Sequence, residues 1–155
     1  MGSRLSEDVG IIPLYEAKDW VAGADSESFE LSKGALADII IMTGVLTVPG
    51  TVSLFSGATA AAKTTALPFT YRLSTADYAA AGADLYGADV AEADGILTLS
   101  ATAHDHRVIV LSIAAADLPV GHQWVTAAIA AGTAQFLTAV AIIRGLRYQP
   151  PQTAI

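Results

Sequence analysis

Short stretches in which apolar and polar residues alternate recur along most of the chain. Alternation with a period of two is typical of β-strands that bury one face. In residues 50–57, for example, Val52 and Leu54 fall on one side of the predicted strand, and Thr51 and Ser53 fall on the other. The stretches that carry this pattern are residues 28–33 (SFELSK), 50–57 (GTVSLFSG), 68–74 (PFTYRLS) and 95–103 (GILTLSATA).

Two further runs are apolar at almost every position and rich in β-branched residues. They are residues 37–46 (ADIIIMTGVL) and 107–114 (RVIVLSIA). β-Branched side chains are enriched in strands, so both runs are predicted to be strands as well. Residues 117–121 (DLPVG) are predicted to turn the chain after the second run.

Residues 123–143 (QWVTAAIAAGTAQFLTAVAII) carry no charge and are long enough to form a membrane-spanning helix. The segment is nevertheless mostly Ala, Thr and Gly, and Gly132-Thr133 divides it into halves that each fit a strand. In each half, the residues on the two sides of the predicted strand differ little in polarity, as they do in strands covered on both sides. We therefore predict a hairpin of two strands here and keep the membrane helix as an alternative.

Strands at short intervals, separated by turn residues, are typical of an antiparallel sandwich or barrel. We predict an all-β antiparallel β-sandwich over residues 28–150, and a jelly-roll-like arrangement is one form it could take. Residues 1–27 mix charge, glycine and proline and are predicted to be an extended N-terminal arm or loop that orders on a partner. Residues 151–155 are predicted to be an extended C-terminal tail, because Pro150-Pro151 at its start cannot pair in a ladder.

The composition of the 155-residue chain narrows its classes of function. The net charge is −7 and the eight Lys and Arg residues form no cluster, so a direct nucleic-acid partner is not expected. The chain has no cysteine, which excludes disulfides and thiolate zinc sites. It is 53% hydrophobic, but alanine supplies much of this fraction and aromatic residues only 7%. Because small side chains build a thin core, this surplus of apolar residues suggests that some surface is buried against another subunit. The start MGSRLSEDVG lacks the apolar core of a signal peptide, so synthesis in the cytoplasm is expected.

One stretch has the spacing of a phosphate-binding loop. Gly57, Lys63 and Thr64 fit the motif G-x-x-x-x-G-K-[ST], but Ala62 stands where the second glycine belongs. Pro68 would also cut short the helix that should follow. We therefore predict a loop between two strands rather than a nucleotide site.

Two groups of residues could hold a metal ion. His104 and His106 would point to the same side of an extended strand, whereas His122 lies in a predicted turn. The favoured interpretation of residues 104–106 is a polar turn in which Asp105 supplies hydrogen bonds. An acidic segment, residues 74–95, lacks the spacing of a known calcium loop and is predicted to be a solvated loop; its acids are Asp77, Asp84, Asp89, Glu92 and Asp94. No catalytic residue and no cofactor are predicted.

Several features resemble a known family through their order along the chain. They are a strand ending in Gly-Ala-Thr at 57–59, an apolar strand running into Asp117-Leu118, the Val/Ala-rich residues 123–143, and Arg147-Tyr148 before a proline. Over residues 36–150 the chain resembles small virion structural proteins of tailed bacteriophages, of the β-sandwich decoration or cement type. The resemblance implies a non-enzymatic protein on the capsid surface of the virion, which binds the major capsid protein and copies of itself, often as a trimer. It implies no membrane.

Three aromatic residues are candidate partner contacts. Tyr15 and Trp20 lie in the predicted arm, and Trp124 could anchor the last strands either in the core or on a partner. Three alternative functions remain. The first is a tail or head-to-tail joining protein, and the second is a soluble module that binds a divalent ion or ligand through residues 77–94 or through His104 and His106. The third is a small membrane protein anchored by residues 123–143.

Overall fold

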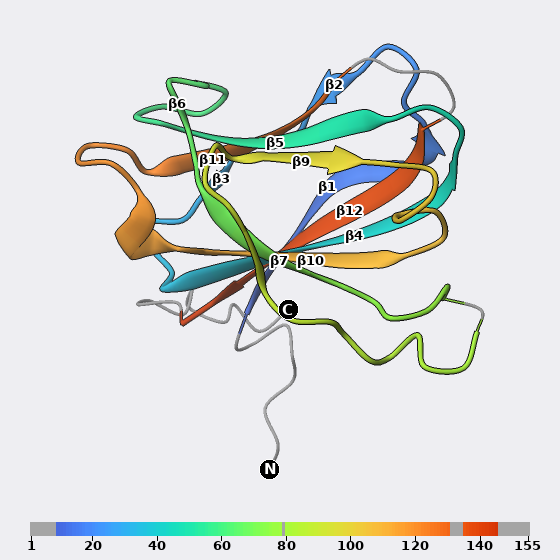
Figure 1. Cartoon of the computed structure of the whole chain (residues 1–155). Coiled ribbons are helices and arrows are strands. Elements are labelled where there is room, and N and C mark those ends of the chain that lie inside the picture. The colour runs from blue at the N-terminus through green and yellow to red at the C-terminus, as the bar shows by residue number, and fades with distance from the viewer. Residues whose placement is uncertain (1–8, 79, 131–134, 146–155) are drawn as a thin grey trace, which may run out of the picture.

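Two antiparallel β-sheets are stacked face to face (Figure 1). The structure is a computed structural model that describes residues 9–78, 80–130 and 135–145. Sheet A runs in the order β1 (Gly10–Asp19), β12 (Gln135–Arg144), β4 (Leu36–Leu46), β10 (Val108–Ala114), β7 (Phe69–Leu73) and β8 (Val90–Glu92). Sheet B runs in the order β2 (Ala24–Asp25), β11 (Trp124–Ile129), β5 (Gly50–Gly57) and β6 (Thr65–Ala66), with β3 (Phe29–Glu30) also beside β11 and β9 (Ile96–Leu99) beside β5.

The chain passes repeatedly from one sheet to the other. β1, β4, β7, β8, β10 and β12 belong to sheet A, whereas β2, β3, β5, β6, β9 and β11 belong to sheet B. The last two strands are inserted among the first: β12 lies between β1 and β4, and β11 lies between β2 and β5 (Figure 1). This wrapping is the jelly-roll form of the double-sheet sandwich. The predicted all-β sandwich is confirmed, including its jelly-roll form.

Alternate residues along the strands face inward and form one apolar core between the sheets. In β5, Val52 and Leu54 are buried while Thr51 and Ser53 on the other side are half-exposed, as the alternation predicted. Burial of a side chain of this size contributes about 1.5–3 kcal/mol. The largest fully buried side chains come from both sheets and are Phe29, Leu31, Ile39, Ile41, Leu54, Leu67, Leu97, Leu99, Ile109, Leu111, Ile113 and Leu137.

Residues 10–19 form a strand of the sandwich, not part of the arm predicted for residues 1–27. β1 pairs with β12 from Gly10 opposite Ile143 to Asp19 opposite Phe136. The register shifts around Tyr15, and such bulges break the alternation by which strands are recognised in a sequence. Residues 1–8 and the predicted tail, 151–155, lie outside the described residues, as does Arg147-Tyr148.

The two strands predicted within residues 123–143 are confirmed, but the hairpin that was to join them is wrong. β11 pairs with strands of sheet B and β12 with strands of sheet A. Each has its own inward apolar side, Val125 and Ala127 in β11 and Ala139 and Ala141 in β12. Each can therefore complete a different sheet, although neighbouring strands in a sequence more often pair with each other.

The side chain of Tyr15 crosses the core from one sheet to the other. It extends from β1 of sheet A, and its hydroxyl donates a hydrogen bond to the carbonyl of Ala127 in sheet B at 2.8 Å. Burial, reinforced by the carboxylate of Asp25, raises the pKa of Tyr15 well above its usual range, so the hydroxyl remains a donor at alkaline pH. The ring of Trp20 stands edge-on to Tyr15, with 5.0 Å between ring centres. The N-terminal strand is thus fixed to both sheets.

Substitution of Tyr15→Phe is expected to lower the free energy of unfolding by about 1 kcal/mol. The loss is modest because the carbonyl of Ala127 still accepts a hydrogen bond from the backbone N–H of Ser26. Urea unfolding followed by fluorescence measures the change. Tyr86→Phe is the control, because Tyr86 is 41% exposed. Equal stabilities of the two variants would contradict the role given to the Tyr15 hydroxyl.

Candidate interaction surface

His104 and His106 lie in successive turns between β9 and β10 and do not face a common site. The buried His104 accepts a hydrogen bond at Nδ1 from the backbone N–H of Ser100 at 3.0 Å. His106 has a positive φ of 53° and lies beside the ring of Tyr78, with 5.7 Å between ring centres. The turn predicted here is confirmed. Among the residues that the structure describes, no group of three or more His, Cys, Asp or Glu side chains could hold a metal ion.

The turn at residues 101–106 is held against β4 by buried polar contacts. Thr43 is buried, donates its hydroxyl to the carbonyl of His104, and accepts the backbone N–H of Arg107 at 3.0 Å. Asp105 accepts the backbone N–H of Leu46 at 2.8 Å. Asp105 is predicted to bond within the turn, but this hydrogen bond reaches across to β4. Its other carboxylate oxygen lies 3.1 Å from Nδ1 of the adjacent His106. These residues anchor a turn.

His122 pairs with Ser56, a contact that the sequence did not suggest because 66 positions separate the two residues. The Nδ1 atom of His122 lies 2.9 Å from the hydroxyl of Ser56. A hydroxyl bonded to an imidazole resembles part of a nucleophilic site. Ser56, however, is fully buried at the end of the core, where a substrate could not reach it. His122 thus provides a hydrogen-bond partner for the buried hydroxyl of Ser56.

The stretch with the spacing of a phosphate-binding loop is a tight connection between β5 and β6. Gly57 packs so closely on Ala62 that a Cβ atom at Gly57 would lie 2.5 Å from the Ala62 side chain. Lys63, the residue that would contact phosphates, forms an ion pair with Asp25 at 2.8 Å. The chain then enters β6 and not the helix whose N-terminus such a motif uses. The predicted loop between strands is confirmed.

The acidic residues 74–95 contain turns, the short strand β8 and an isolated bridge between Ser74 and Tyr86. Asp89 accepts two hydrogen bonds from Arg72 at 2.5 and 2.9 Å, and this guanidinium lowers the pKa of the Asp89 carboxyl. Asp77 pairs with Arg107 at 3.3 Å. Two of the acids thus bind arginines, one in β7 and one just before β10, instead of converging on a cation.

Two of the three predicted aromatic contacts are used inside the molecule. Tyr15 is only 5% exposed, so it offers no surface to a partner. Trp20 is half-buried and its Nε1 donates to the carbonyl of Leu137 at 3.2 Å. Trp124 differs from both. It is half-buried at the start of β11, on the outward side of sheet B, because the next residue, Val125, faces the core. Trp124 alone remains a candidate contact among the three.

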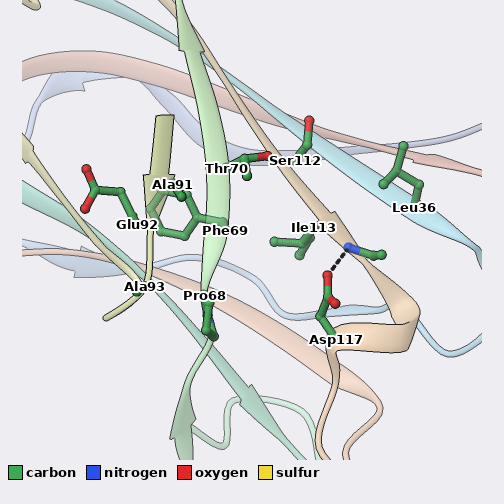
Figure 2. A pocket seen from close by; sticks show the side chains of 11 residues that line it. Leu36, Pro68, Phe69, Thr70, Ala91, Glu92, Ala93, Ser112, Ile113 and Asp117 are labelled. Atoms are coloured by element: carbon green, nitrogen blue, oxygen red, sulfur yellow. Dashed lines mark hydrogen bonds between the residues drawn. The ribbon is translucent and has the colours of Figure 1, made fainter. Parts of the chain in front are cut away.

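A groove of about 590 Å³ opens where β7 and β10 separate (Figure 2). Pairing of these strands ends with Thr70 opposite Ser112. Asp117 of the 3₁₀ turn η1 (Ala115–Asp117) accepts the backbone N–H of Ala114 at 3.2 Å, and Ser112 donates to Asp38 at 2.7 Å. The groove's other walls are largely apolar, from Leu36, Pro68, Phe69, Ala91, Ala93 and Ile113. Its polar groups do not converge as they would in a catalytic site.

One row of residues on the outward side of sheet A is apolar across four adjacent strands. Residues directly opposite each other in an antiparallel pair share one side of the sheet. Ile40 of β4 lies opposite both Val140 of β12 and Val110 of β10, and Val140 lies opposite Pro13 of β1. Rows on either side of this one add four more apolar residues. We call the whole set the apolar face: Ile11, Pro13, Ile40, Met42, Val108, Val110, Val140 and Ile142.

Three members of the apolar face, Ile11, Pro13 and Met42, are exposed, and the others are half-buried. Ile11 is 47% and Met42 is 44% exposed. Ile40, Val110 and Val140 are intermediate, as neighbouring side chains on a pleated surface shield one another. Contiguous exposed apolar surface marks interaction sites more often than isolated exposed residues do. This face is therefore the best candidate functional surface of the described residues.

Charged residues border the apolar face in pairs of opposite sign. Asp38 forms an ion pair with Arg144 of the neighbouring strand β12. Arg72, which lies opposite Val110, is paired with Asp89. On β1, Lys18 pairs with Glu16 at 2.5 Å. The border is thus electrically balanced, although the chain as a whole carries a net charge of −7.

The sequence prediction did not include the apolar face, although the signal for it is present. Strands covered on both sides have near-continuous apolar sequences. Residues 37–46 and 107–114 have such sequences, yet in the sandwich only one side of β4 and β10 meets the core. Which side faces inward could not be known before the sheet order was known.

No helix among the described residues is long and apolar enough to cross a membrane. The chain matches no protein-family model, no curated protein and no solved structure at a significant level.

The buried His104 is expected to make folding pH-dependent. Burial lowers the pKa of His104 below the ordinary value of 6.5, so the unfolded chain takes up this proton more readily than the folded chain. The stability that depends on the neutral ring is complete above about pH 6.5 and decreases as the pH falls towards the lowered pKa. In His104→Asn the amide oxygen can still accept the Ser100 N–H but does not titrate.

Urea unfolding midpoints measured from about pH 7 to about pH 5 test this expectation. The wild-type midpoint should fall more steeply than that of His104→Asn over this interval. Parallel curves for the two proteins would show that His104 does not titrate on unfolding.

Proposed function

We propose that the chain is a non-enzymatic structural protein of a tailed-bacteriophage virion, which binds the capsid exterior and stabilises it. Its partners in this role are the major capsid protein and further copies of itself. The observation that carries the proposal is the apolar face, because an outward-facing apolar side of a β-sheet is suited to assembly and not to chemistry.

The polar residues agree with a structural role. The side chains that first suggested chemistry, His104, His122 and Lys63, are bonded to a backbone amide, a buried serine and an aspartate respectively. Jelly rolls occur in viral capsid proteins and also in lectins and enzymes, so the fold alone does not decide between functions. The resemblance in the order of sequence features over residues 36–150 favours the virion protein.

The two outward sides of a sandwich point in opposite directions, so one side can meet a copy while the other meets the shell. On sheet B, Trp124 of β11 lies opposite Gly57 of β5. Ser53 and Phe55 of β5 are half-exposed on the same outward side. A tryptophan that is apolar in its body and polar at its N–H is a frequent binding anchor. We assign the capsid contact to the outward side of sheet B, with Trp124 as its anchor.

Capsid shells of the phage whose genome encodes the chain, prepared without it, are expected to bind the purified protein saturably in co-sedimentation. Trp124→Ala should weaken this binding tenfold or more, which corresponds to about 1.4 kcal/mol. Tyr86→Ala, which removes another partly exposed aromatic ring, is the matched control and should bind like the wild type.

Equal binding of both variants would exclude Trp124 as the anchor. Failure of the wild-type protein to bind shells would contradict the capsid assignment. Binding to isolated tails or connectors in place of shells would identify a joining protein.

A further inference from the structure

We infer that the apolar face is the interface between two copies of this chain, which pack sheet A against sheet A around a two-fold axis. The inference deepens the proposed function, on which it rests for its biological setting. It specifies how the copies meet, and it leaves the outward side of sheet B for the capsid.

The first argument is the distribution of apolar and polar residues on sheet A. The centre of the sheet's outward side is the row Pro13, Val140, Ile40 and Val110. Polar residues flank this row on the same strands, Asp38 and Ser112 on one side and Thr138 on the other. Thr70 and the Arg72–Asp89 ion pair follow towards the edge of the sheet. An apolar centre with a polar rim is the anatomy of a protein–protein interface.

The second argument is charge, which favours a second copy over other partners. Two chains of net charge −7 repel one another wherever unpaired acids meet. At the apolar face, the bordering charges Asp38 and Arg72 are already neutralised by Arg144 and Asp89. A copy can therefore approach here without like-charge repulsion, whereas a strongly basic or acidic partner would find no complementary charge.

The third argument is area. Strands about 4.8 Å apart and residues rising about 3.4 Å each give the apolar face, which is four strands wide and spans residues 38–42 along β4, a footprint of roughly 330 Å². The six strands of sheet A at their full lengths give the whole side of the sheet roughly 750 Å². A specific interface buries about 800 Å² on each partner, within a range of about 600–1,000 Å². The whole side of sheet A is large enough for such an interface, whereas the apolar centre alone is not.

The fourth argument is that sheet edges are poor alternatives for association. On the edge strand β1, Pro13 lacks an N–H and bulges flank Tyr15. The opposite edge strand, β8, has only three residues. Face-to-face packing remains, and two identical apolar sides can interdigitate at a sheet separation of about 10 Å. A two-fold axis makes the contact self-complementary.

Sedimentation equilibrium of the full chain tests the inference. The wild type should have twice the 15.9 kDa mass of one chain. Val110→Lys places a charge in the centre of the face and should raise the dimer dissociation constant at least a hundredfold. Val120→Lys is the matched control, because Val120 is fully exposed in the turn before β11. It should remain a dimer.

Cross-linking tests the same contact without adding a charge. The chain has no cysteine, so a single introduced thiol reacts without background. Ile40→Cys treated with a bis-maleimide that spans about 10 Å should give a covalent dimer, because packed sheets lie about that far apart. Val120→Cys should not. This cross-linking test can be carried out even if the Val110→Lys protein is too unstable to study.

A wild-type mass of one chain or of three chains would overturn the inference. So would a dimer that survives Val110→Lys and does not cross-link through Ile40→Cys. Failure of the proposed function gives a different result. A dimer that is disrupted by Val110→Lys and cross-links through Ile40→Cys, but binds no shell, refutes the capsid function and supports the interface. A monomer that binds shells refutes only the interface.

Discussion

The pairing of β12 with β1 and β4 is the interaction on which the rest of the structure depends. A strand inside a sheet must satisfy its backbone N–H and C=O groups on both sides. β4 finds one partner in β10 and the other in β12, the last strand of the chain, and β12 in turn holds β1 at the edge. Sheet A is therefore complete only when residues more than 90 positions apart have met, and such long-range topologies fold slowly.

This constraint also explains the two apolar sides of sheet A. Burying Ile39 and Ile41 of β4 in the core turns Ile40 and Met42 outward, because the side chains of a strand alternate. The neighbours β10 and β12 follow the same register, so single outward residues become a continuous surface. The core and the candidate interface are thus opposite sides of the same strands, and a substitution on the outward side can change association with little effect on the core.

Residues of the kind found in catalytic sites stabilise turns and loops in this fold. Thr43 and Asp105 hold the turn before β10, His122 satisfies the buried Ser56, and Lys63 ties the loop after β5 to Asp25. None of these pairs is local in the sequence. A jelly roll with small loops needs such contacts because its connections cross from sheet to sheet and cannot stabilise themselves by pairing with an adjacent strand.

The sequence by itself determined the strands that alternate regularly or are continuously apolar, and the core residues on them. Alternation in residues 50–57 and 68–74 identified the inward residues, because a period of two follows from strand geometry alone. β1 was missed, since Pro13 and the bulges around Tyr15 disturb that period. Only the tertiary structure decided that β11 and β12 separate into different sheets, that Tyr15 spans the core, and that Ile40, Val110 and Val140 meet on one surface. Pairing between distant strands depends on the packing of all of them at once, and no local pattern records it.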